Sequence, residues 1–87
     1  MRFTVVYNNT NDRYSMGVDT ISGRFYISIP VSNSFVDYEE YYDLEQWEFD
    51  LFKKNESEAL LFVKKCRNRE LDQRLLIKPG SNRGSAV

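Results

Sequence analysis

The hydrophobic and polar positions in the first third of the chain follow the pattern of β-strands. The segments 2–7 and 24–31 are rich in β-branched and aromatic residues, and polar turn-forming residues follow each of them. Pro30 lacks a backbone N–H, which suits the end of a ladder or an edge. The segment 13–18 fits a short strand or an extended loop, because Gly17 weakens its strand pattern. This part of the chain predicts two clear strands and an uncertain one between them.

An acidic segment, residues 36–44, comes next and has the alternation of a strand with two different sides. It contains acids and tyrosines but no base, and alternate side chains of a strand point to opposite sides. The side suited to cover a core bears Val36, Tyr38, Glu40, Tyr42 and Leu44. The side expected to face outward bears Asp37, Glu39, Tyr41 and Asp43. A short polar turn should pair this segment with residues 24–29 as a hairpin, while its register and the partner of Arg24 stay open.

The apolar spacing changes to that of helices after the acidic segment. Trp47 and Leu51 lie one helical turn apart, which predicts a first helix over residues 45–54. Asp43 and Gln46 have the spacing of a capping box at its start. Acids at the beginning and lysines at the end of this segment complement the helix dipole.

A second helix is predicted over residues 56–69. Asn55 and Glu58 have capping-box spacing at its start. Its apolar stripe consists of Ala59, Phe62, Val63 and Cys66. Leu61 lies on the opposite side among basic residues, so another element covers it or it is exposed.

The remaining residues predict a last short strand over 74–78, which Pro79 and Gly80 end. Residues 80–87 are predicted to form a flexible tail. Strands followed by helices favour an α+β fold, in which an antiparallel sheet of three to four strands is covered on one face by two helices. A chain of 87 residues suits a single domain, which we expect to occupy residues 1–79.

Charge is unevenly distributed, although the net charge is only −1. Residues 37–50 carry seven acids and no base, whereas residues 51–87 carry nine bases and four acids. One interpretation is that the two regions neutralise each other within the fold. The other is that the acids form a docking surface for a basic partner.

Several kinds of chemistry are poorly supported by the composition. Histidine is absent, which removes the commonest general base and the commonest transition-metal ligand. The single cysteine, Cys66, lies on an apolar stripe, which predicts a buried and inert thiol. Asp37, Glu39 and Asp43 could offer oxygen ligands to Ca²⁺ or Mg²⁺, but a strand spreads them apart instead of wrapping them round an ion. No glycine-rich phosphate-binding motif is present. We therefore expect neither an enzyme nor a metal or cofactor site.

Three functional hypotheses remain. The first is a non-enzymatic protein-binding domain that docks a basic protein through Asp37, Glu39, Tyr41 and Asp43, because tyrosines among acids suit a protein interface. The second is a small ligand-binding or enzymatic domain whose tail closes over a pocket through Ser81, Asn82 and Arg83, with Arg83 holding an anion. The third is a nucleic-acid binder that uses the bases in and after the second helix: Lys64, Lys65, Arg67, Arg69 and Arg74. The acidic segment would repel phosphate in that case.

The N-terminal residues do not have the pattern of a signal peptide, and no apolar run is long enough for a membrane helix. A single cysteine suits a reducing compartment. We expect a cytoplasmic protein with no membrane association.

Three segments, 26–33, 37–42 and 78–84, resemble those of small uncharacterised bacterial proteins of about this length. In size, acidity and lack of catalytic residues the chain is also similar, by type and not by motif, to the immunity proteins of bacterial toxin systems such as contact-dependent inhibition. That resemblance implies an acidic surface that covers the phosphate-binding surface of a cationic nuclease-type toxin.

Overall fold

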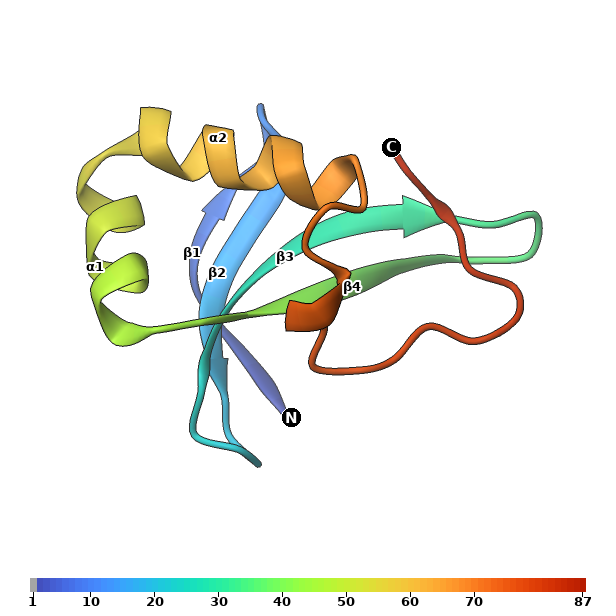
Figure 1. Ribbon diagram of the computed structural model, residues 1–87, viewed down its shortest axis with the longest axis horizontal. Coiled ribbons are helices and arrows are strands. Elements are labelled where there is room, and N and C mark those ends of the chain that lie inside the picture. Colours follow the sequence, from blue (N-terminus) through green and yellow to red (C-terminus); the bar gives the residue numbers. More distant parts are fainter. Residues whose placement is uncertain (1) are drawn as a thin grey trace.

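The first half of the chain forms an antiparallel meander in the computed structural model, which describes residues 2–87 (Figure 1). Its strands are β1 (Phe3–Asn9), β2 (Tyr14–Asp19), β3 (Phe25–Ser32) and β4 (Asp37–Leu44), and they lie in the sheet in chain order. The uncertain segment 13–18 is therefore a full strand, which pairs with β1 on one side and with β3 on the other.

Two helices, α1 (Gln46–Lys54) and α2 (Glu56–Arg67), cover one face of this sheet (Figure 1). The predicted α+β fold is confirmed. The second helix ends two residues earlier than predicted, and Arg69 just beyond it adopts a left-handed conformation with φ of 59°. Between the sheet and the helices lies the core, formed by Tyr14, Met16, Ile27, Ile29, Val31, Tyr42, Leu44, Phe49, Phe52, Ala59, Val63, Cys66 and Leu75.

The sequence predicted the N-cap of α2 correctly but not that of α1. Asn55 is the N-cap of α2 and accepts a hydrogen bond from the Glu58 backbone N–H (3.4 Å), as predicted. The predicted box from Asp43 is wrong, because Asp43 lies inside β4 and Glu45 is the N-cap of α1. The Glu45 backbone N–H donates to the Glu48 carboxylate instead (2.9 Å).

The predicted strand over 74–78 is also wrong. Residues Asp72–Arg74 form a short 3₁₀ helix, η1, and only Leu75 then bridges β4, opposite Tyr42. The Leu76 backbone N–H donates to the Tyr41 carbonyl (2.9 Å). Leu75 is buried in the core, and among the described residues its bridge to Tyr42 does not continue into a strand ladder along β4.

The segment 80–87, predicted to be a flexible tail, is packed against the sheet. Its residues Ser85–Ala86 form β5, which pairs with β3 at Val31 and Ser32. Because β4 covers one side of β3 and β2 pairs only with its first half, β5 extends the β2 side of the sheet. Gly84 is required here, since a Cβ atom on it would lie 2.6 Å from the backbone of Ser32.

Arg83 fixes the same segment to the centre of the fold through two carboxylates. Its Nε donates to Glu40 (2.7 Å) and its Nη1 to Asp72 (2.7 Å). The Tyr42 hydroxyl donates to Glu40 as well (3.1 Å). Glu40 is buried, so these contacts supply the counter-charge and the hydrogen bonds that its carboxylate needs.

Candidate functional site

The four acidic-strand residues predicted to face outward lie together on the face of the sheet that the helices leave open. Their neighbours along β4, among them Tyr38, Tyr42 and Leu44, pack on the helical side. The open face of β4 is formed by Asp37, Glu39, Tyr41 and Asp43. The alternation of the sequence therefore describes the two sides of this strand, but the four residues have very different surroundings.

Tyr41 belongs to an aromatic cluster that closes part of the open face. Its ring stacks on Phe3 of β1, with 3.6 Å between ring centroids, and both rings pack edge-on against Tyr26. In a flat sheet β1 and β4 would lie roughly 14 Å apart, so this stacking requires the sheet to curl strongly. Burial raises the pKa of Tyr41. Tyr41 thus supports the fold of this face and offers a partner only a partly exposed ring.

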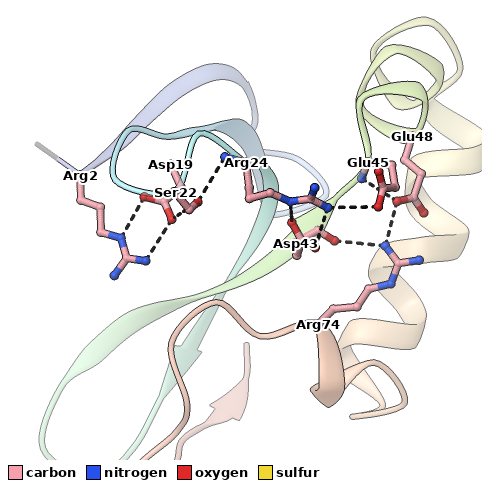
Figure 2. A network of polar contacts seen from close by, with 8 residues as sticks. All are labelled: Arg2, Asp19, Ser22, Arg24, Asp43, Glu45, Glu48 and Arg74. Atoms are coloured by element: carbon pink, nitrogen blue, oxygen red, sulfur yellow. Dashed lines mark hydrogen bonds and ion pairs between the residues drawn. The ribbon is translucent and has the colours of Figure 1, made fainter.

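Asp43 forms an ion pair with Arg24 of the same chain (Figure 2). Arg24 donates two hydrogen bonds to its carboxylate, from Nε (2.6 Å) and Nη2 (2.9 Å). The same guanidinium also reaches Glu45 (3.1 Å). The question that the sequence left open, whether Arg24 meets an acid of the neighbouring strand, is answered by this bidentate pair.

Three other acids of the region 37–50, Glu40, Glu45 and Glu48, have a cationic partner too. Glu40 pairs with Arg83, and Glu48 pairs with Arg74 (2.8 Å; Figure 2). Among the residues that the structure describes, the acids of this region without an ion pair are Asp37, Glu39 and Asp50. Two of these three lie side by side on the open face of β4.

Glu39 differs from the paired acids, because its carboxylate is partly buried and accepts a hydrogen bond from a neutral hydroxyl group. The Ser28 hydroxyl donates to it (3.0 Å), while burial raises the pKa of Glu39. On the neighbouring strands Ser15, which pairs with Ser28, donates to Asn8 (2.7 Å). A row of polar side chains thus crosses the curled face from β1 to β4, beside a cavity of about 190 Å³.

The sequence pattern did not indicate the three partners in this row, Asn8, Ser15 and Ser28. The alternation of its strand places Ser28 on the same outward side as Tyr26, so the sequence could have indicated this residue. Asn8 and Ser15 are brought next to each other by the strand register, which the sequence does not reveal.

Asp37 lies at the exposed start of β4, where no strand of the described residues pairs with the outer edge of this strand. Tyr41 and Asp43 use their carbonyls on that edge to accept hydrogen bonds from Leu76 and Arg74. By the alternation of a strand, the backbone of Asp37 and Glu39 points to the same edge. A cavity of about 390 Å³ lies beside it and is lined by Asn33, Val36, Tyr38, Glu39, Glu40, Tyr41, Ile77, Lys78, Pro79, Gly80 and Asn82.

The structure places the residues of the tail hypothesis differently from expectation. Arg83, expected to hold an anionic ligand, is already bonded to Glu40 and Asp72. Asn82 lies beside the cavity at the edge of β4, and its carbonyl accepts a hydrogen bond from Asn33 (2.9 Å). An added anion would have to compete with two carboxylates for the Arg83 guanidinium.

The basic residues of the nucleic-acid hypothesis are largely engaged within the fold. Arg67 donates to backbone carbonyls of the β1–β2 turn, and Arg69 donates to the Gly84 carbonyl (3.1 Å). Arg74 bonds to Glu48. Only Lys64 and Lys65 of this group point freely to solvent.

Cys66 is buried, and burial raises the pKa of its thiol to about 12, so it stays protonated at neutral pH.

Over residues 2–87, no three acidic, cysteine or histidine side chains gather where a metal ion could bind. In the same part of the chain, no helix combines the length and apolarity needed to cross a membrane.

The ion pair between Arg2 and Asp19, beside the turn between β2 and β3, leads to a prediction of how the stability of the fold changes at acidic pH (Figure 2). Arg2 donates to the buried Asp19 from Nε (2.9 Å) and Nη2 (3.0 Å), and these bonds hold the pKa of Asp19 well below its usual range. Arg83 lowers the pKa of Asp72 in the same way.

Both pairs should stabilise the fold fully above the unfolded-state pKa of about 3.9, and their contribution should disappear as the pH falls toward the lower folded pKa values. Urea midpoints measured from pH 7 to pH 3 test this. Asp19→Asn should be less stable at pH 7 and show a shallower loss in acid, and an equally steep loss in that variant would contradict the assignment.

Comparisons of this chain with protein-family models, with curated proteins and with solved structures found no match.

Proposed function

We propose that this chain is a non-enzymatic protein-binding domain that binds a basic, extended segment of a partner protein at the end of β4 that carries Asp37 and Glu39. The observation that carries the proposal is that these two carboxylates lack a cationic partner in the part of the chain that the structure describes, while Asp43, Glu40 and Glu48 have one. Side chains two positions apart on a strand lie roughly 7 Å apart on the same face. Lysine or arginine side chains at alternate positions of an extended partner match that spacing.

The partly buried state of Glu39 gives such a partner a reason to bind. Burial raises the pKa of Glu39, which means that its charged form is destabilised in the free protein. A cation brought to the Ser28 side of the carboxylate would compensate for the lost solvation. The cost is present in the free protein and is relieved on binding.

The edge of β4 supports an extended partner in particular. The backbone of Asp37 and Glu39 faces an edge that has no strand beside it in the described structure. An extended segment can add to such an edge through main-chain hydrogen bonds. The adjoining cavity, with Val36, Tyr38 and Ile77 among its lining residues, offers apolar contacts to alternate side chains of that segment.

Among basic partners, the first class to test is the cationic nuclease-type toxin of a bacterial toxin–immunity pair. Its phosphate-binding surface presents clustered lysine and arginine side chains. An acidic end of a strand that enters this surface would compete with nucleic acid for the same cations.

The proposal predicts the behaviour of Asp37→Asn/Glu39→Gln toward a defined probe, an acetylated hexapeptide of alternating lysine and valine. Titrated into isotope-labelled wild type, this peptide should shift the amide signals of residues 37–39 and of Asn8 and Ser15. The double variant should bind it about tenfold more weakly and with a smaller dependence on salt, because two charge contacts are lost.

A matched control is Asp50→Asn, which removes an exposed acid of α1 that has no ion pair among residues 2–87 and should leave peptide binding unchanged. Glu39→Gln alone should raise the urea midpoint at pH 7, because a carboxyl whose folded pKa is raised stabilises the fold below its unfolded pKa and less as the pH rises. Equal binding by wild type and the double variant would refute the proposed site.

A further inference from the structure

The outer surface of the two helices carries a second feature that the open sheet face does not explain. Trp47 on α1 is 66% exposed and Leu61 on α2 is 60% exposed. They flank a groove of about 240 Å³ between the helices, which Leu51, Phe52 and Phe62 also line. Single exposed apolar residues are common, but a tryptophan and a leucine on either side of one apolar groove form a continuous patch.

Charged residues mark the two ends of this groove on α2. Glu58 and Lys65 both line it, and each is exposed with no ion pair among residues 2–87. They are seven residues apart, so they lie on the same side of the helix, separated by two turns. Leu61 is almost midway between them.

The charged residues of α2 as a whole follow the same order, with acids near its N-terminus and bases near its C-terminus. The acids of α2, Glu56 and Glu58, stand in its first turn, and its bases, Lys64, Lys65 and Arg67, stand in its last turn. An antiparallel copy of the helix would therefore place acids opposite bases at both ends. A parallel copy would place like charges together, which is unfavourable.

We infer that a second copy of this chain binds the helical face, with the two α2 helices antiparallel about a two-fold axis close to Leu61. Symmetry then makes each contact twice: Glu58 of one copy faces Lys65 of the other, and the reverse. Leu61 meets its counterpart at the axis, and the exposed tryptophan widens the apolar contact. The open face and edge of β4 lie on other sides of the molecule and stay free in such a dimer (Figure 1).

Sedimentation velocity of the wild-type chain over a wide concentration range tests the inference. The sedimentation coefficient should rise with concentration from the monomer to the dimer value. Leu61→Asp should weaken self-association by about 30-fold or more, because it places a charge at the centre of the contact. Since Leu61 is exposed in the monomer, this variant should keep the wild-type circular dichroism and melting temperature. A wild type that sediments as a monomer at every concentration overturns the inference.

Charge exchange distinguishes the antiparallel pair from any other use of the groove. Glu58→Lys and Lys65→Glu should each weaken self-association by about tenfold, because two attractive contacts become repulsive. The variant with both changes should recover the wild-type affinity, and an equimolar mixture of the two single variants should form a mixed dimer. Lys64→Glu alters the net charge as much as Lys65→Glu does but lies outside the groove, so it should have little effect. Failure of the combined variant to recover would overturn the antiparallel arrangement.

Discussion

Replacing Arg83 with methionine is expected to destabilise the protein by about 3–5 kcal/mol, because it leaves the Glu40 carboxylate buried without a counter-charge. Arg83 bonds to Glu40 through Nε (2.7 Å) and Nη2 (3.1 Å), and its own side chain is only 14% exposed. The same change frees Asp72 and loosens the segment that carries β5. Urea unfolding at pH 7 measures the effect.

Two further variants make this prediction specific. Arg13→Met removes an exposed arginine without an ion pair in the described structure, and it should change stability by less than about 0.5 kcal/mol. Glu40→Gln/Arg83→Met should be more stable than Arg83→Met alone, since the uncompensated charge is then absent. If Arg83→Met and the double variant unfold at the same urea concentration, the buried charge is not the cause.

Gly17→Ala is expected to destabilise the protein by about 2–3 kcal/mol through overpacking. A Cβ atom at this position would lie 1.9 Å from the Thr4 carbonyl oxygen and 2.8 Å from the Tyr26 hydroxyl. The carbonyl belongs to β1, so the strand would have to move away from β2. That movement would also pull Phe3 off Tyr41, because Phe3 lies at the start of the same strand.

Gly80→Ala is the matched control for this substitution. No atom lies within 4 Å of a Cβ placed on Gly80, and its φ is not in the left-handed region. We expect its urea midpoint to equal that of wild type. Aromatic signals of Tyr41 that shift in Gly17→Ala but not in Gly80→Ala would support the link between β1 spacing and the stacked rings. Equal stability of the two variants would contradict it.

At Glu39, the proposed binding of a basic segment and the stability of the fold favour different side chains. A neutral glutamine at position 39 would avoid the desolvation penalty of the partly buried carboxylate, yet this carboxylate is what a basic segment would recognise. A natural protein often keeps such a cost where a surface must bind something. The measured gain in stability and loss of binding in Glu39→Gln would be two results of the same cause.

Local patterns predicted much of this architecture because their physical origin is local. The alternation in 36–44 defined the two sides of β4, and the helical spacing located both helices to within one or two residues. The cap at Asn55 was predicted because a cap depends on residues three apart. The strand predicted over 74–78 was wrong, because a short apolar run is compatible with a strand and also with a loop that buries a single residue in the core.

The sequence by itself determined that this chain is an α+β domain with one acidic side on one strand, because side-chain periodicity and turn residues act over a few positions. Only the tertiary structure decided which of those acids stay available. Arg24 and Arg83 lie 19 and 43 residues from the carboxylates that they neutralise, and the curl of the sheet brings Phe3 onto Tyr41. Pairing across such separations depends on strand register and on the path of the chain, which no local pattern contains.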